Sequence, residues 1–454
     1  MHCIRLWAVV FCFQFRLRLL VIKHQIFRAG IVHFSQSTTD PDKDVKCYSD
    51  GALVIAHDKI VALGPYKETA TDYPNAQYHD HRGRWIIPGL IDSHLHYPQT
   101  EMIACYGKQL LHWLETYTFP TEKKFAEDAY SRKIASTFLR QLLKNGTTTG
   151  LVFSSVHASA TDILFDAASE QNMAIIAGKV CMDRNCPPWL QDTAESAQRE
   201  SASLIDKWHG KGRNLYGLTP RFAPTSTQAQ MSALGELAQQ YPDVFIQTHL
   251  SENMDEIEWV KSLYPDTDGY LDVYDKYHMV RPRAVFGHCI HLTDHEWQRL
   301  GESGATAAFC PTSNLFLGSG LFNLDKARAV EANLALASDV GAGTSFNMFR
   351  TYGEGYKIAQ LQQQTFSALQ GLYMMTQGPA SAYNMENAIG NLNPGTMADF
   401  VVLSPEFDEL SALRLADTAS AQDMLFALSM LGDDRAIHQT WVAGKCLYNQ
   451  TEVI

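Results

Sequence analysis

The sequence lacks an excess of positive charge. Its 454 residues contain 37 Lys and Arg against 49 Asp and Glu, which gives a formal net charge of −12 at pH 7. A nucleic-acid binder needs a basic face to meet phosphates, so this balance argues against that class. It permits an enzyme that acts on a neutral or cationic small molecule. The length and the hydrophobic content of 46% allow a substantial core, in two or three domains or in one α/β barrel with additions.

Paired cysteines are also missing. The nine cysteines are scattered along the chain, their number is odd, and no two form a C-x-x-C pair. A small secreted domain held by disulfides would show an even set at regular spacing. The pattern therefore favours free thiols in a reducing compartment, and we expect a cytoplasmic protein.

The opening segment lacks the uninterrupted apolar run of a membrane span or a secretion signal. Residues 1–25 are apolar and basic without any acid, but Arg16 and Arg18 break the apolar run, and no small-residue cleavage site follows. A basic, acid-poor composition also suits a cleaved organelle-targeting segment. We favour an over-extended start, translated from upstream of the working protein, and place residues 1–25 outside the fold.

Both ends of the remaining chain show strand-like patterns. Short runs of β-branched and apolar residues, broken by Gly, Asp and Pro, follow residue 26, and similar runs lie at residues 399–403 and 439–445. Two all-β pieces at opposite ends of a chain can pair, because chain ends often meet. We predict a small β-sandwich built from residues 26–86 and 391–452.

Between these ends, short apolar runs alternate with longer, helix-compatible stretches. The runs GTTTGLVF, DVFIQTHL and ATAAFCP are typical of buried parallel strands, and DHEWQRLGESG of a helix with Gly at its end. Repeated βα units indicate a (β/α)₈ barrel or a doubly wound sheet. The residues capable of chemistry follow several different strands, which is where barrels place their active sites. We therefore predict a (β/α)₈ TIM barrel over residues 87–390.

The strongest local signal is the segment PGLIDSHLH, residues 88–96. Side chains alternate faces along a strand, so His94 and His96 project to the same side and can bind one ion. Imidazole nitrogen suits Zn²⁺ or Fe²⁺, and a catalytic site keeps one position open for water. The pair follows a strand-like run and has distant partners, which favours a metal site over incidental histidines.

Other candidates each end a further strand-like run. His249 closes VFIQT, His288 closes AVFG, and Asp339 closes LALAS. A lone aspartate at a strand end is usually a turn or cap residue, but in this ordered set Asp339 becomes a candidate metal ligand. Glu252 lies three residues after His249, a spacing that lets its carboxylate reach over the site as a general acid and base without ligating.

Such a set supports hydrolysis at an electron-poor carbon. A bound ion lowers the pKa of water from about 15.7 towards roughly 7, so hydroxide exists at neutral pH and can attack a ring carbon that bears an amine. Glu252 can collect the proton lost by the water, and can then protonate the adjacent ring nitrogen and the departing amine.

These residues resemble a known family. The segments PGLIDSHLH, HLSEN, GHC and the SDVGAG that contains Asp339 are similar to those of the amidohydrolase superfamily, in its zinc-dependent ATZ/TRZ-like branch. The resemblance is closer to the guanine deaminases of that superfamily, and runs from about residue 27 to the end. Segments that carry it are the 27 residues from His96 to Glu122, KNGTTT, GKVCMDRN, TPRFAPTS, THLSEN, CPTSNLFLGSGLFNL and LGDDR.

The resemblance implies a set of roles. His94, His96, His249 and Asp339 would hold one zinc, with iron as the alternative metal. His288 would orient the attacking hydroxide or shuttle a proton, and Glu252 would carry protons, so Glu252, His288 and Asp339 form the expected catalytic group. Gln99 and Arg221 would read guanine, with Phe222 packing nearby and His249, Glu252 and Asp339 also close to the substrate.

Arg221 suits guanine because the carbonyl and N7 of that base form an acceptor edge. Adenine presents a donor amine there, and a buried donor left without a partner costs about 1–3 kcal/mol. The resemblance also implies a homodimer and the conversion of guanine and water to xanthine and ammonia, with no nucleic-acid or membrane partner. The P-C-x-x-C of the cytidine-deaminase type of zinc site is absent.

Two departures and three alternatives remain at this point. Ala337 and Ser338 replace the family's usual Gly and Thr before the last ligand, and Gly287 replaces its usual Ala before His288. Another mononuclear amidohydrolase, acting on adenosine derivatives or triazines, would use the same ion. A binuclear cyclic-amide hydrolase would require a bridging carboxylated lysine, for which Lys179 is an ambiguous candidate. A non-catalytic scaffold is the third alternative, although all of the expected ligands and Glu252 are present.

Overall fold

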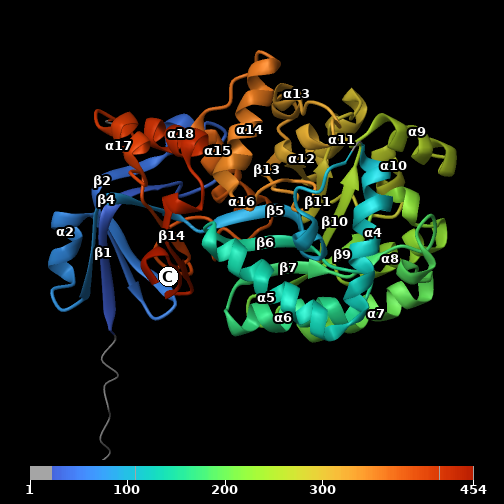
Figure 1. Ribbon diagram of the computed structural model, residues 1–454, viewed down its shortest axis with the longest axis horizontal. Helices are drawn as coiled ribbons and strands as arrows, with labels where there is room; N and C mark the ends of the chain where they lie inside the picture. The colour runs from blue at the N-terminus through green and yellow to red at the C-terminus, as the bar shows by residue number, and fades with distance from the viewer. Residues whose placement is uncertain (1–22, 108, 419, 453–454) are drawn as a thin grey trace, which may run out of the picture.

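The computed structural model describes residues 23–107, 109–418 and 420–452. A barrel of strands surrounded by helices lies beside a separate sheet to which both ends of the chain contribute (Figure 1). The part of the expected extension that covers residues 1–22 lies outside the described residues. Strand β1 (His24–His33) begins two residues before the boundary predicted at residue 26.

The separate sheet contains seven strands in the order β16-β15-β14-β4-β1-β2-β3. The pairing of β14 with β4, which is antiparallel, joins the two ends of the chain. This confirms that the terminal segments form one β structure outside the barrel, while the exact domain boundaries stay predictions. The strands are β1, β2 (Lys46–Ala56), β3 (Lys59–Pro65), β4 (Gln77–Pro88), β14 (Phe400–Leu403), β15 (Ile437–Val442) and β16 (Lys445–Asn449).

The barrel strands pair in the order β5-β6-β7-β9-β10-β11-β12-β13, each parallel to the next, with the short β8 against β9. The last and first strands meet where Asp339 N–H donates to the carbonyl of His94 at 2.8 Å, and the predicted barrel is confirmed. The strands are β5 (Leu90–His96), β6 (Thr147–Phe153), β7 (Ala174–Gly178), β8 (Val180–Cys181), β9 (Leu215–Pro220), β10 (Phe245–Leu250), β11 (Ala284–His288), β12 (Thr306–Phe309) and β13 (Asn333–Leu336).

Helices follow the barrel strands and cover them. The predicted helix at DHEWQRLGESG is α11, which begins after a capping box between Thr293 and Glu296 and ends at Gly304, whose φ is 71°. The helices are α1 (Pro41–Asp44), α2 (Tyr66–Asp72), α3 (Leu110–Trp113), α4 (Phe119–Glu122), α5 (Asp128–Lys144), α6 (Ala158–Glu170), α7 (Ala194–Trp208), α8 (Gln228–Gln240), α9 (Met254–Leu263), α10 (Tyr270–Asp275), α11 (Asp294–Ser303), α12 (Pro311–Phe316), α13 (Leu324–Ala329), α14 (Met348–Leu361), α15 (Ala368–Met374), α16 (Gln377–Ala382), α17 (Glu409–Leu415) and α18 (Ala421–Leu431).

Short turns of 3₁₀ or π helix complete the chain, and two of them border the barrel's C-terminal end. Turn η1 directly follows β5, and η2 is a π-helical turn between α3 and α4. No helix in the described part of the chain is long and apolar enough to cross a membrane. The turns are η1 (Tyr97–Met102), η2 (Leu114–Thr118), η3 (Lys123–Ala126), η4 (Pro188–Leu190), η5 (Ala223–Thr225), η6 (Asp434–Ala436) and η7 (Gln450–Glu452).

A layer of apolar side chains from neighbouring strands fills the barrel, so it encloses a packed core rather than a pore. Because this layer is packed, a substrate can reach polar side chains only at the C-terminal ends of the strands, where the loops leave room for it. The layer contains Ile91, Leu151, Ile176, Phe245, Val285 and Ala308, all buried.

Candidate active site

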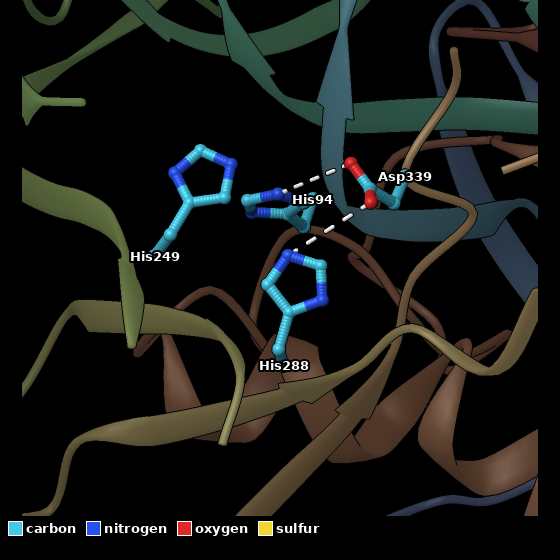
Figure 2. Close-up of side chains that lie close together, drawn as sticks. All are labelled: His94, His249, His288 and Asp339. Carbon is cyan, nitrogen blue, oxygen red and sulfur yellow. Dashed lines mark ion pairs between the residues drawn. The ribbon is translucent and has the colours of Figure 1, made fainter. Parts of the chain in front are cut away.

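Five side chains of types that can bind a metal converge at the C-terminal end of the barrel. His94 and His96 end β5, His249 is the penultimate residue of β10, His288 ends β11, and Asp339 follows β13. Ligand atoms of His94, His249, His288 and Asp339 all lie within 4.8 Å of one another (Figure 2). The barrel's closure brings these strand ends together although the residues are far apart in the sequence.

His96 reaches the same place. Its Nε2 lies 3.2 Å from Nε2 of His249 and 3.2 Å from Oδ1 of Asp339. Nε2 of His94 lies 3.4 Å from the same oxygen. The four residues predicted as metal ligands therefore face one another around a common space instead of pointing apart.

Hydrogen bonds on the outer side fix which nitrogen faces this space. Nδ1 of His249 donates to the carbonyl of Arg221 at 2.6 Å, which leaves the lone pair on Nε2. Nδ1 of His288 donates to Oδ1 of Asn314 at 2.9 Å, with the same consequence. Both rings thus present an unprotonated Nε2 to the site.

The protonation states suit cation binding. Burial is the main cause that lowers the pKa of His94, His96 and His249, that of His96 to about 3, so these imidazoles are neutral near pH 7. Burial alone would raise the pKa of Asp339, but the nearby rings of His94 and His96 outweigh it and hold that pKa well below its usual range. The site combines neutral nitrogen donors with an ionised carboxylate.

This donor set fits a divalent metal ion. Neither ring nitrogen of His94 has a hydrogen-bond partner, and Nε2 of His288 has none either, although both side chains are buried. Orphaned polar atoms at this depth are costly, and neutral imidazoles gain little from facing a carboxylate unless a cation lies among them. Three imidazoles and a carboxylate are ligands that zinc and iron both accept.

The backbone at the strand ends supports the convergence. His288 and Asp339 have φ of 72° and 49°, in the left-handed region that is uncommon for residues other than Gly, although His, Asp and Asn adopt it more often than most. Such strain persists only where the surroundings impose it, and it is common at functional sites. Here it turns both side chains back over the barrel mouth.

Glu252 lies beside this cluster, two residues beyond β10. It is 2% exposed, its Oε1 accepts a hydrogen bond from Ser319 at 2.8 Å, and its Oε2 lies 3.4 Å from Nε2 of His288. Burial, and next the charge of Asp339, raise the pKa of Glu252 to about 8. A carboxyl group with such a pKa can both take and give a proton near neutrality.

A pocket joins the cluster to the predicted substrate-reading residues. Gln99, Arg221 and Phe222 line it together with His96, His249, His288, Glu252 and Asp339. His94 is not part of the lining, but its Nε2 lies 3.4 Å from Asp339, so the structure brings the whole predicted set together. The remaining walls are mostly apolar, which suits a flat aromatic substrate. The apolar side chains that line it are Leu110, Trp113, Leu114, Leu317 and Ala342.

Comparisons with known proteins agree with this geometry. The amidohydrolase family model matches residues 85–447. A protein of Escherichia coli (strain K12) named guanine deaminase is 47% identical over 427 residues, which cover 93% of this chain and 97% of that relative. The chain belongs to the amidohydrolase family. The resemblance inferred from its motifs is confirmed.

Solved structures place this amidohydrolase near the same relatives. The structure of E. coli guanine deaminase matches with a TM-score of 0.92 and 46% identity, over 94% of this chain and 100% of that one. A guanine deaminase from C. acetobutylicum with guanine bound in its active site matches with a TM-score of 0.84 and 29% identity, over 94% and 100% of the two chains. An adenosine deaminase from Xanthomonas campestris with bound zinc reaches 0.78 at 22% identity, over 95% and 94%, which shows the fold alone.

Sequence reasoning missed four residues that support this amidohydrolase's site. Glu122 accepts hydrogen bonds from Arg221 and Gln99, Ser319 holds Glu252, and Asn314 holds His288. Glu256 accepts the backbone N–H of Glu252 at 3.0 Å. All four stand in segments that carry the family resemblance or directly follow one, but only the three-dimensional structure reveals their partners.

Lys179 does not approach the cluster's ligand atoms in the way a bridging ligand would. Its buried ammonium pairs with Asp192 at 2.7 Å and Glu200 at 3.5 Å. These carboxylates, with the other charges nearby, outweigh the effect of burial and raise the pKa of Lys179 above its usual value, so the group is charged and unreactive towards carbon dioxide. The described residues of the amidohydrolase therefore include one group of side chains that could hold a metal ion.

The departure at Gly287 has a structural reason. A Cβ at this position would lie 2.7 Å from Cε1 of His94, closer than real contacts allow. The ring of His94 therefore occupies the space of the missing side chain and packs directly against Gly287. Ser338 is buried two residues after β13, where its N–H donates to Asp92 at 2.9 Å, and nothing in the structure requires the family's Thr.

Proposed function

We propose that this amidohydrolase removes the exocyclic amine of guanine hydrolytically, giving xanthine and ammonia. The observation that carries the proposal is one pocket lined by four of the five cluster residues together with Glu252, Gln99 and Arg221, with His94 directly against Asp339 of that lining. Two relatives that match over 93% of this chain, at 47% and 37% identity, are named guanine deaminase and probable guanine deaminase.

His94, His96, His249 and Asp339 would hold one zinc ion, with iron as the alternative metal. The support is their mutual contacts of 3.2–3.4 Å and the neutral state of the imidazoles. A bound ion supplies Lewis acidity, which lowers the pKa of water enough for hydroxide to form near neutral pH. His288, held by Asn314, stands at the edge of this set, where its Nε2 can orient the attacking water or pass a proton.

Glu252 moves the protons. Its Oε2 takes a proton from the attacking water and gives it to N3 of guanine as the oxygen bonds to C2. The same carboxylate then takes the proton of the new C2 hydroxyl and gives it to the amine, so that the C2–N bond breaks, ammonia leaves and C2 becomes a carbonyl. The raised pKa of Glu252, about 8, suits both directions of transfer.

Gln99 and Arg221 bind the edge of guanine that carries O6 and N7, while Phe222 packs against the ring. Arg221 is 2% exposed, so an N–H without a partner in its guanidinium would be costly. Guanine offers acceptors to such donors, whereas the exocyclic amine of adenine does not. The geometry therefore favours guanine over adenosine derivatives, the main alternative substrates.

The setting that we propose is a cytoplasmic homodimer. Free thiols support a reducing compartment, since all the cysteines that the described residues include are unpaired. Dimerisation rests on the family resemblance. The partners are guanine and water, with neither nucleic acid nor membrane.

Parallel assays with guanine, adenine, cytosine and methylthioadenosine, combined with metal analysis of the purified protein, test this function. We expect xanthine from guanine at a kcat/KM at least about 100-fold above that for any of the others, with about one zinc per chain. Preferred turnover of methylthioadenosine would favour the adenosine-type alternative. A metal-free, inactive protein would favour the scaffold.

A further inference from the structure

Glu122 is a completely buried carboxylate to which the mechanism assigns no role. It ends α4, and both of its oxygens accept from Nη1 of Arg221 at 3.0 Å. The ring of Phe119, one turn earlier, lies 5.8 Å from the guanidinium carbon. Burying two charges costs free energy unless hydrogen bonds compensate, so this ion pair indicates that the pocket wall needs Arg221 to be paired and held in place.

The same carboxylate also determines how Gln99 points. Nε2 of Gln99 donates to Oε1 of Glu122 at 3.3 Å, and Oε1 of Gln99 accepts from the N–H of Gly341 at 3.3 Å. A carboxylate only accepts and a backbone N–H only donates, so both neighbours demand the same orientation of the amide. A flipped amide would lose both hydrogen bonds.

This arrangement leaves donors for the substrate. Glu122 uses one guanidinium nitrogen of Arg221 and one N–H of Gln99, so Nη2 and Nε of Arg221 and the second N–H of Gln99 are free to bind a ligand. The ion pair also neutralises Arg221, so the wall donates hydrogen bonds without a net charge. Such a wall fits a neutral heterocycle whose edge carries acceptors.

We propose that Glu122 is a positioning residue that sets the hydrogen-bonding polarity of the pocket wall and so determines substrate selectivity. This inference rests on the proposed function, because it concerns how that site distinguishes an acceptor edge from a donor edge. Glu122 acts through Arg221 and Gln99 and touches neither the reacting atoms nor the metal-binding cluster.

Glu122→Gln tests the proposal with little change in shape. The carboxamide presents an NH₂ group where the carboxylate offered only acceptors, so it faces a donor of Gln99 or Arg221 and favours a flip of the Gln99 amide that turns its oxygen to the substrate. The comparison ligand is 2,6-diaminopurine, which keeps the 2-amine of guanine but replaces O6 with an amine. Binding is measured as KM for guanine and as the inhibition constant of 2,6-diaminopurine, so turnover of the analogue is not required.

We expect KM for guanine to rise at least about tenfold in Glu122→Gln while kcat changes less than about threefold. The preference for guanine over 2,6-diaminopurine should fall at least about tenfold, and zinc content should stay the same. Glu127→Gln is the matched control, because Glu127 is an exposed glutamate five residues further along the chain. Glu127→Gln should reproduce the parent in all three measurements.

Two further variants separate a positioning role from a structural one. Because Glu122 acts partly through Arg221, the double variant Glu122→Gln/Arg221→Ala should lose less than the product of the two single losses in kcat/KM. Glu122→Asp keeps the charge, so it should keep the preference for guanine even though KM rises, and it serves if Glu122→Gln fails to fold.

An unchanged preference in Glu122→Gln, fully multiplicative losses in the double variant, or a lost preference in Glu122→Asp would overturn the inference. Those results leave guanine deamination by the parent protein untouched. A parent that does not convert guanine would instead refute the proposed function.

Discussion

For single residues, the strictest constraint on this site is the direction in which each polar atom points. His249 and His288 are fixed by acceptors behind their rings, and Glu252 is fixed by Ser319. These supports lie outside the cluster, but they decide which lone pair or proton faces the substrate. Altering one of them should affect the chemistry more than the fold.

Ser319→Ala tests this for Glu252, the proposed proton carrier. The substitution removes the hydroxyl that donates to Oε1 of Glu252 at 2.8 Å, so the carboxylate is freer to leave its position and its charged form loses a stabilising contact. A hydrogen bond to a charged group contributes about 1.5–3 kcal/mol, so kcat for guanine should fall at least roughly tenfold with KM little changed. Steady-state kinetics measure both.

Ser262→Ala supplies the control for that experiment, because its side chain is exposed and bonds only within the end of α9. It should behave like the parent. If Ser319→Ala retained full kcat, Ser319 would not hold Glu252 in the reacting state.

How much of the site could be predicted depends on where each residue stands. His94, His96, His249, His288 and Asp339 end recognisable apolar runs, so the pattern of strands predicts that they meet. The pair Glu122–Arg221 is separated by 99 positions, and Glu252–Ser319 by 67. Buried carboxylates and hydroxyls in short helices and loops have no local pattern, so their partners appear only in the folded structure.

Among the secondary-structure elements, β5 and β11 lie in close contact beside the cluster. The ring of His94 occupies the space beside Gly287 that a side chain would need. The position of His94, a proposed metal ligand on one strand, therefore depends on the absence of a side chain at Gly287 on another.

Gly287→Ala should displace His94. The new Cβ would lie 2.7 Å from Cε1 of a ring that has no free space, since His94 is fully buried. Overpacking of this kind costs about 1–3 kcal/mol, so we expect a lower thermal midpoint and less zinc per chain than in the parent. Calorimetry and metal analysis measure the two effects.

Gly217→Ala on β9 is a matched control, because the nearest atom to its Cβ would be 3.5 Å away, an ordinary contact. Normal zinc content in Gly287→Ala would mean that β11 moves to make room and that His94 does not depend on the glycine.

The order of strands was predictable because each apolar run is followed by a helix-compatible stretch, as in the capped helix α11. The irregular segment between β5 and α5 was not, because α3, η2 and α4 are too short to show a period. This segment carries Glu122 and much of the apolar pocket wall, which explains why those residues were missed.

On the scale of the whole molecule, the two chain ends meet in the sheet beside the barrel. Its core includes Phe27, against which the rings of His79 and His81 lie stacked, and His438 lies edge-on to His81. Burial, and next the charge of His438, lower the pKa of His81 to about 4, and neither of its nitrogens has a partner.

This histidine cluster should make the fold sensitive to acid. The pKa of His81 in the folded protein lies below the value of about 6.5 for an unfolded chain, so protons favour the unfolded state. The contribution of His81 to the free energy of unfolding is fully present above about pH 6.5, and it is lost as the pH falls from there towards 4. We expect the thermal midpoint to drop between pH 7 and pH 5, and to drop less in His81→Phe.

His57→Asn, a change at an exposed histidine, provides the comparison and should leave the parent's drop unaltered. An equal drop in His81→Phe and the parent would assign the acid sensitivity to other groups.

The pairing of the chain ends was predictable from their strand patterns, but the stacking of histidines on Phe27 was not, because it depends on the register between β1 and β4.

The proposed deamination, with Glu252 as its proton carrier, is tested most directly by metal analysis and guanine turnover in Glu252→Gln. The substitution keeps the shape of the side chain and removes its ability to carry a proton, while the expected ligands His94, His96, His249 and Asp339 remain. We predict an unchanged zinc content, with kcat reduced by about 10²–10⁴-fold. Normal conversion of guanine to xanthine by Glu252→Gln would show that Glu252 does not carry the protons of the reaction.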